Sequence, residues 1–179
     1  CMNRERFRRL LKEPGIIPIP GAFDAWSARL VERAGFPAAY MTGYGASASV
    51  LGRPDIGLMT MSEMVAQARN MAAAVDIPLV VDGDTGYGGV LNVIRTVEEF
   101  EAAGVAAIQL EDQVFPKRCG HMEGKQLIPR QEMAAKIRAA VAARRSEDLL
   151  IIARTDARAV AGLKDAIERA RAYADAGAH

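Results

Sequence analysis

The chain has 179 residues, of which half are hydrophobic, 23 are Lys or Arg and 22 are Asp or Glu. This composition supplies enough apolar side chains for a buried core and argues against a disordered chain. Because the charges nearly balance, no global field favours nucleic acid or an anionic membrane, and we expect neither as a partner.

The sequence indicates neither a targeting segment nor a disulfide framework. The first residues lack an apolar signal core, and no uninterrupted run of about 18 apolar residues occurs anywhere. Two cysteines are too few for a disulfide framework, so we expect Cys119 to be a free thiol, while Cys1 at the terminus is compatible with an expression remnant. These features predict a cytoplasmic protein.

Short apolar or β-branched segments alternate with longer Ala-rich amphipathic segments. The segments predicted as strands are, in chain order, residues 16–19, 38–41, 79–81, 106–110 and 149–153. The segments predicted as helices are residues 25–34, 61–74, 90–103, 130–144 and 163–176. Gly35, Gly104 and Gly177 each follow a predicted helix at the place of a left-handed C-cap. The alternation predicts repeated βα units around a parallel sheet.

Five βα units do not close a barrel of eight strands, which usually takes about 250 residues. We therefore expect one domain over residues 1–179 that holds the first five βα units of a (β/α)8 barrel of the TIM type, with the C-terminal part of the barrel missing. A doubly wound open sheet is the alternative, because strand number alone does not separate the two folds.

Aromatic and methionine side chains within the predicted helices are interpreted as core rather than as contacts to a cofactor. They are Trp26, Phe100, Met61, Met64 and Met71.

Polar residues gather directly after four of the predicted strands. They are Tyr40, Thr42, Gly43 and Tyr44, then Asp82, Asp84 and Thr85, then Glu111 and Asp112, and finally Arg154, Thr155 and Asp156. In a parallel barrel the carboxyl ends of the strands share one rim, where active sites are built. We therefore expect these residues, far apart in sequence, to converge.

Asp82 and Asp84 lie two residues apart in a glycine-rich segment, residues 82–88. If the third strand continues through them, both side chains point to the same side. A hard divalent cation suits such a pair, because Mg²⁺ takes oxygen ligands, often from one or two carboxylates, and keeps several waters. The alternative is a polar turn in which the aspartates cap the next helix.

Residues 115–121 form a polar, glycine-containing segment that is too long for a tight turn, which is typical of a functional loop or lid. Cations and a histidine near Cys119 would lower the pKa of its thiol and make it a nucleophile or proton donor. An ordinary exposed cysteine in a basic loop is the alternative. The basic side chains also suit a small anionic carboxylate substrate.

Other kinds of site find little support. With only His121 and His179, a histidine-rich zinc site is disfavoured. Neither a Gly-x-Gly-x-x-Gly segment after a strand nor a Gly-x-x-x-x-Gly-Lys-Ser/Thr loop occurs, so the sequence favours neither dinucleotide binding nor a phosphate-cradling nucleotide fold.

Five ordered blocks resemble the isocitrate lyase/phosphoenolpyruvate mutase superfamily, from about Gly21 to the end of the chain. They are PGAFDA at 20–25, LGRPDIG at 51–57, DGDTGYG at 82–88, LEDQ with KRCGH within 110–121, and ARTDA at 153–157. The chain is most similar to the methylisocitrate lyase, dimethylmalate lyase and petal-death-protein branches. The resemblance implies a (β/α)8 barrel, usually a homotetramer, that binds Mg²⁺, with Mn²⁺ as an alternative, and a 2-hydroxy or 2-oxo dicarboxylate at its rim.

The resemblance also implies roles for individual residues. Asp82 and Asp84 would hold the metal directly, and Asp55 and Glu111 would reach it through water. The residues implied to bind substrate are Thr42, Gly43, Tyr44, Gly120 and Arg154. The residues implied to be catalytic are Cys119 as the acid, Tyr40 as an aid to deprotonation of the substrate hydroxyl, Lys117 and His121.

These roles imply cleavage of a C–C bond in a methylisocitrate-like or alkylmalate-like substrate, to an oxo acid and a carboxylate. Phosphoenolpyruvate mutase or carboxyphosphonoenolpyruvate mutase chemistry is the first alternative, and the mutase branch typically carries Asn where this chain has Cys119. Oxaloacetate hydrolysis is the second alternative. A non-catalytic binding or assembly subunit is the third, and the joint presence of the carboxylates, Cys119 and Arg154 argues against it.

Overall fold

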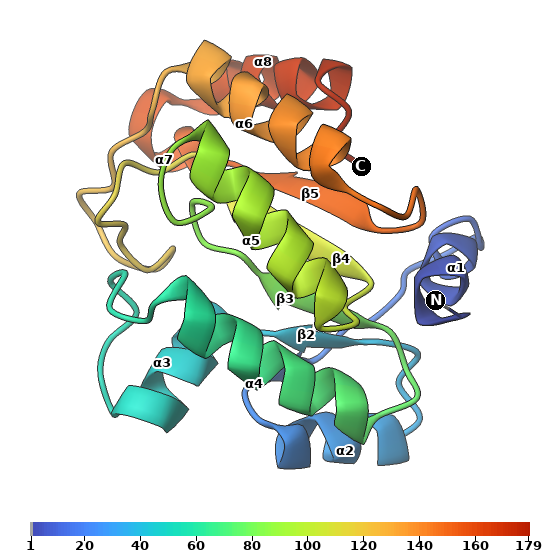
Figure 1. The fold of residues 1–179 in the computed structure, drawn as a ribbon. Coiled ribbons are helices and arrows are strands. Elements are labelled where there is room, and N and C mark those ends of the chain that lie inside the picture. The colour runs from blue at the N-terminus through green and yellow to red at the C-terminus, as the bar shows by residue number, and fades with distance from the viewer. Residues whose placement is uncertain (1) are drawn as a thin grey trace.

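Five parallel strands form one sheet in a computed structural model that describes residues 2–179 (Figure 1). Cys1 lies outside the described residues, so its interpretation as a remnant is not tested. The strands are β1 (Gly21–Ala22), β2 (Ala39–Met41), β3 (Leu79–Asp82), β4 (Ala107–Glu111) and β5 (Leu150–Arg154). The helices are α1 (Met2–Leu10), α2 (Ala25–Arg33), α3 (Gly43–Leu51), α4 (Met61–Ala74), α5 (Val90–Ala102), α6 (Arg130–Ala143), α7 (Ala157–Ala161) and α8 (Leu163–Asp175).

The spatial order of the strands follows their order along the chain, β1-β2-β3-β4-β5, and every pair is parallel. A doubly wound sheet reverses its strand order at a switch point, and this sheet has none. The arc of successive βα units is the arrangement of a TIM-type barrel. The predicted fold class is therefore confirmed, and the open-sheet alternative is wrong.

One layer of helices covers the outer face of the sheet. Figure 1 shows α4, α5 and α6 side by side across this face, with α8 beside α6. The main core fills the space between the layers, and Phe100, Met64, Met71 and Met133 are almost fully buried in it. Phe100, Met64 and Met71 thus lie in the core as predicted, whereas Trp26 on α2 is 67% exposed and its assignment to the core was wrong.

Helix α1 packs at the opposite end of the sheet from the rim (Figure 1). Its Phe7 is 1% exposed and belongs to a second, smaller cluster with Val80 and Leu150 on the inner face of the sheet. The Arg4 guanidinium donates to the Val105 carbonyl over 2.9 Å and lies 3.4 Å from a Glu101 carboxylate oxygen. These contacts tie the first helix to the start of β4, about a hundred residues later in the chain.

The first strand is shorter and later than predicted. Residues 16–19 form no strand, and the ladder begins only at Gly21, where the Thr42 amide donates to the Ala22 carbonyl. Pro18 and Pro20 explain the error, because proline has no N–H to give to a ladder.

The helix α3 was not predicted because its sequence, GYGASASVL, is rich in residues with weak helix propensity. Capping contacts at both ends compensate for this weak helix propensity. The Thr42 hydroxyl accepts from the Gly45 amide over 2.7 Å, and Gly52 ends the helix in the left-handed region at φ 60°. By contrast, α4 has the predicted bounds, because Thr60 and Glu63 form a reciprocal capping box at its start.

None of the helices formed by residues 2–179 combines the length and the apolar character that a membrane crossing requires.

Candidate active site

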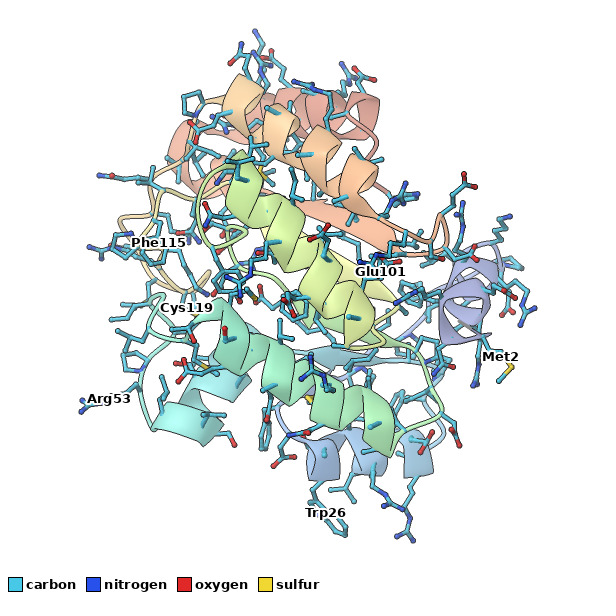
Figure 2. All side chains as sticks on the ribbon, in the orientation of Figure 1. Met2, Trp26, Arg53, Glu101, Phe115 and Cys119 are labelled. Carbon is cyan, nitrogen blue, oxygen red and sulfur yellow. The ribbon has the colours of Figure 1, made fainter. Side chains whose placement is uncertain are left out.

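A cavity of about 220 Å³ lies at the carboxyl ends of the strands. Figure 2 places Cys119 and Phe115 at this end of the molecule, with Met2 at the other. Ten predicted site residues line the cavity: Tyr40, Thr42, Gly43, Tyr44, Asp55, Asp82, Cys119, Gly120, His121 and Arg154. The other three, Asp84, Glu111 and Lys117, are buried next to it and contact Asp82, Arg154 and Asp55 respectively. The structure thus brings all thirteen together.

The four predicted metal carboxylates, those of Asp55, Asp82, Asp84 and Glu111, are each less than a tenth exposed. Asp82 is fixed by two backbone donors, the Asp84 amide at 3.0 Å from Oδ1 and the Gly43 amide at 3.3 Å from Oδ2. A methyl group added at Gly43 would lie 2.8 Å from Asp82 Oδ2 and 3.7 Å from Asp55 Oδ2. Glycine therefore lets the backbone approach both carboxylates.

Lys117 lies beneath the cavity rather than in it. Its ammonium is 2.5 Å from Asp55 Oδ1 and 2.7 Å from Asp84 Oδ1, with a side chain that is 3% exposed. Burial alone would lower the pKa of Lys117, but the Asp84 and Asp82 carboxylates outweigh it and raise that pKa. In this structure the Lys117 ammonium neutralises the carboxylates, and its implied catalytic role stays a prediction.

The carboxylates repel one another even with this lysine present. Burial, followed by the charge of Asp82, raises the pKa of Asp84 to about 7. The same two causes, in the same order, raise the pKa of Glu111 to about 7. Four acidic groups share the cations of Lys117 and Arg154, which leaves an excess of negative charge when all are ionised.

This donor set fits a hard divalent cation, because it consists of oxygen atoms and carries uncompensated negative charge. Among residues 2–179, no three His, Cys, Asp or Glu side chains stand close enough to hold one ion together. In the predicted arrangement only Asp82 and Asp84 bind the metal directly, and Asp55 and Glu111 contact it through water molecules. That arrangement stays a prediction.

The opposite wall of the cavity suits a carboxylate substrate. Arg154, at the end of β5, has its Nε 3.6 Å from Glu111 Oε2 and its Nη2 3.2 Å from Asp156 Oδ2, and a third of its side chain is exposed. Gly120 lies so close to the Arg154 guanidinium that any side chain there would collide with it. The N-terminus of α3 also borders the cavity, and the positive end of the helix dipole favours an anion there, although the Gly43 amide itself already donates to Asp82.

The loop of residues 113–127, here called the rim loop, carries Cys119. Gln113 pairs with Leu127 at its base, and the Val114 amide donates to the Gln126 carbonyl over 2.8 Å. Cys119 is half-buried, and its Sγ lies 3.7 Å from Nδ1 of the exposed His121. The thiol thus faces the cavity from a loop whose ends are fixed.

Gln113 is a residue of the site that the sequence reasoning missed. Its amide nitrogen donates to Glu111 Oε2 over 3.1 Å and to the Arg118 carbonyl, while its oxygen accepts from the Arg118 amide. One buried side chain therefore connects a candidate metal carboxylate to the rim loop. The only signal in the sequence was its place in the LEDQ block.

Tyr40 is protonated at neutral pH. Burial, followed by the charge of Asp82, raises the pKa of its phenol, and Gln109 Nε2 donates to the phenol oxygen over 2.9 Å. Tyr40 can therefore assist deprotonation by donating a hydrogen bond, and it does not act as the base itself.

An arc of parallel βα units with carboxylates, an arginine and a thiol around one rim cavity defines a TIM-barrel protein with an acidic site at its rim. A family model described as phosphoenolpyruvate phosphomutase matches residues 7–179. The chain belongs to the isocitrate lyase/phosphoenolpyruvate mutase superfamily, as the sequence motifs predicted.

Two similar relatives are lyases. The chain is 53% identical to 2,3-dimethylmalate lyase of Eubacterium barkeri, over 97% of this chain and 60% of the relative. It is 51% identical to 2-methylisocitrate lyase of Bacillus subtilis, over 97% of this chain and 56% of the relative. The chain thus spans little more than half the length of these relatives.

Solved structures share this fold, and two of the three described here hold a small carboxylate ligand. An oxaloacetate acetylhydrolase in complex with 3,3-difluorooxalacetate matches with a TM-score of 0.94 and 44% identity, over 98% of this chain and 61% of that one. A 2,3-dimethylmalate lyase matches with a TM-score of 0.93 and 43% identity, over 98% and 60%. A phosphonopyruvate hydrolase in complex with oxalate and Mg²⁺ matches with a TM-score of 0.90 and 37% identity, over 98% and 60%.

Proposed function

We propose that this protein is a Mg²⁺-dependent lyase that cleaves the C–C bond of a 2-hydroxy di- or tricarboxylate, of the alkylmalate or methylisocitrate type. The observation that carries the proposal is the single cavity in which Asp55, Asp82, Arg154 and the Cys119 thiol meet. The identity to two lyases and the TM-score to a solved dimethylmalate lyase support it.

In this proposal Asp82 and Asp84 hold the metal, and Asp55 and Glu111 orient its waters. A bound Mg²⁺ supplies stabilisation of negative charge that develops on substrate oxygen. The donor chemistry of the four carboxylates and the Mg²⁺ in a related oxalate complex support this assignment. Mn²⁺ is expected to substitute, because it accepts the same oxygen donors.

Residues of the chain bind the substrate, remove its hydroxyl proton and protonate the product carbanion. The Arg154 guanidinium, with the positive end of the α3 dipole, binds and orients the carboxylates of the substrate. Glu111, with a pKa near 7, is suited to accept the hydroxyl proton, and Tyr40 donates a hydrogen bond beside it. The C–C bond breaks as an oxo acid forms, and the Cys119 thiol gives its proton to the carbon that received the electron pair.

A panel of substrates tests this function with the purified full-length protein and Mg²⁺. We expect 2,3-dimethylmalate to yield pyruvate and propionate, or 2-methylisocitrate to yield pyruvate and succinate, both detected by proton NMR. Release of oxalate and acetate from oxaloacetate, with neither hydroxy acid cleaved, would replace the lyase by a hydrolase. Interconversion of phosphoenolpyruvate and phosphonopyruvate by phosphorus NMR would instead indicate a mutase. Turnover of none of these would contradict an enzyme of this type.

Protons compete with the metal in this proposal. Asp84 and Glu111 have pKa values raised to about 7, so each is mostly protonated at pH 6 and mostly ionised at pH 8. Because ligands must be deprotonated, binding releases protons and weakens as the pH falls. We expect the Kd for Mn²⁺ to rise about tenfold between pH 8 and pH 6 for each carboxyl that must ionise. Isothermal titration calorimetry at both pH values measures this, and an unchanged Kd would contradict the assignment.

The same raised pKa values determine whether the stability of the metal-free protein rises or falls with pH. The folded protein binds more protons than the unfolded chain between about pH 4 and pH 7, so these two groups make stability fall as the pH rises through that window. Divalent metal should restore stability at pH 8 more than at pH 6.

We further propose a cytoplasmic homo-oligomer, a tetramer as the family resemblance implies. Three apolar side chains on and beside α2 are exposed, Trp26 by 67%, Leu30 by 49% and Phe23 by 42%. Their exposure supports a subunit interface on this surface. Size-exclusion chromatography with light scattering of the full-length protein measures the oligomeric state.

A further inference from the structure

The rim loop brings Cys119 to the cavity on a long segment between β4 and α6, which Figure 1 shows extending away from the sheet. Contacts within the loop shape its tip. The Met122 amide donates to the Cys119 carbonyl over 2.8 Å. The Lys125 ammonium donates to the carbonyls of Gly120 and Met122. These bonds close the tip on itself, but they do not fix its position relative to the strands.

Gln113 holds the loop at the residue next to Cys119. Its side-chain oxygen accepts from the Arg118 amide over 3.0 Å, and its side-chain nitrogen donates to the Arg118 carbonyl over 2.8 Å. A side-chain amide that bonds both backbone groups of one residue fixes that residue in position and orientation, as a paired strand does. The backbone that leads into the thiol is therefore held by a side chain that is 2% exposed.

A further bond of Gln113 joins the loop to the acidic wall of the site. Its side-chain nitrogen also donates to Glu111 Oε2 over 3.1 Å, and the same oxygen lies 3.6 Å from Arg154 Nε. Glu111 is buried at the end of β4, and Arg154 stands opposite it on β5. One amide thus relates the backbone before the thiol to the two strand ends that carry these side chains.

The bonds of Gln113 can be lost without unfolding the barrel. Arg118 is exposed, so water can replace the two bonds to its backbone when the loop moves. The first half of the loop keeps a separate attachment, because the Lys117 ammonium lies 2.5 Å from Asp55 Oδ1. Loss of the Gln113 amide should therefore free the part of the loop that carries Cys119 and leave the rest in place.

We propose that Gln113 is a positioning residue for proton transfer by Cys119, because it holds the backbone before the thiol at a fixed place relative to Glu111. The inference rests on the proposed lyase function, in which the thiol protonates the carbanion. A displacement of about 1 Å at a reacting group can lower the rate by about 100-fold. Gln113 acts through the thiol and does not touch the substrate itself.

The variant Gln113→Met keeps a side chain of similar length and removes its hydrogen bonds. In the full-length protein with Mg²⁺, kcat should fall by about 10- to 100-fold, whereas the Kd values for Mg²⁺ and oxalate should stay within about threefold of the wild type. Without metal, iodoacetamide should alkylate Cys119 about tenfold faster or more, because the loop opens more often. Mass spectrometry of the peptide that contains Cys119 measures this rate.

A double-mutant cycle separates positioning of the thiol from a general loosening of the fold. In the Cys119→Ser background, Gln113→Met should lower kcat by less than about threefold more, because residues that act as a unit are not additive. A loosened fold would instead lower kcat by the same factor in both backgrounds, and that result would contradict the inference.

Gln126→Met is the matched control, since Gln126 is exposed on the same loop, and it should keep normal turnover and alkylation. If Gln113→Met does not fold, Gln113→Asn replaces it, because the shorter amide cannot reach Glu111 and Arg118 together. An unchanged kcat, an unchanged alkylation rate, or a metal Kd raised as much as kcat falls overturns the inference. Absence of C–C cleavage by the wild type would instead remove the proposed lyase function, and the alkylation rates would still test whether Gln113 holds the loop.

Discussion

Replacing Cys119 by serine in the full-length protein is expected to lower kcat for C–C cleavage by about 100-fold or more, the usual scale for losing a positioned acid. The thiol is half-buried in the wall of the cavity, 3.7 Å from the imidazole of His121. Serine has nearly the same shape, but its hydroxyl is a far weaker acid than a thiol and gives its proton poorly to a carbanion. The loss should therefore fall on the chemical step.

Binding measurements separate this loss from a disturbed site. Cys119→Ser should bind Mg²⁺ and oxalate with Kd values close to those of the wild type, measured by calorimetry. Glu123→Gln, on the exposed part of the same loop, is the control and should retain normal turnover. Near-normal cleavage by Cys119→Ser would remove the thiol from the mechanism and reopen the choice between lyase and mutase.

Replacing Asp82 by asparagine is expected to weaken metal binding by about 100-fold or more and to abolish measurable turnover, because a direct anionic ligand is lost. The carboxylate accepts from two amides, those of Gly43 and Asp84, whereas an asparagine side chain offers a single acceptor oxygen. One amide therefore loses its partner, at a cost of about 1 kcal/mol or more.

Folding of the variant should nevertheless survive. Among the charged groups, Asp82 has the largest part in raising the pKa of both Asp84 and Glu111, so its neutralisation relieves repulsion and offsets the lost hydrogen bond at neutral pH. Calorimetry measures the metal affinity, and urea unfolding checks the fold. Asp148→Asn, at a surface ion pair 3.7 Å from Arg8, is the control and should bind metal normally. Unaltered metal affinity in Asp82→Asn would place the metal elsewhere.

Most of the fold follows from periodicity and capping signals within single segments. The helix at Met61–Ala74 was predicted from its Ala-rich amphipathic pattern with its observed bounds, and the structure shows that Thr60 and Glu63 fix its start locally. The same local reasoning failed where distant contacts decide. Helix α1 was missed because only Phe7 and the paired Arg4 are buried on it. Trp26 was misplaced because amphipathic spacing does not reveal which faces of a helix stay exposed.

The sequence predicted which residues gather at the candidate site, but not which of them line the cavity and which lie buried beneath it. The rule that parallel strands end at one rim was sufficient to collect Tyr40, Asp82, Glu111 and Arg154 in advance. It gave no information about layers beneath the cavity. The burial of Lys117 depends on how the rim loop folds back, which no local pattern encodes.

The contacts of α1 have a consequence for how the chain folds during synthesis. Each strand pairs with the one made just before it, so the sheet can grow in step with translation at the ribosome. Helix α1 is made before the sheet, yet its partners at Val105, Glu101 and Glu147 emerge about a hundred residues or more later. A helix that is synthesised before the sheet is therefore among the last elements to dock, and its docking closes the end of the sheet opposite the rim.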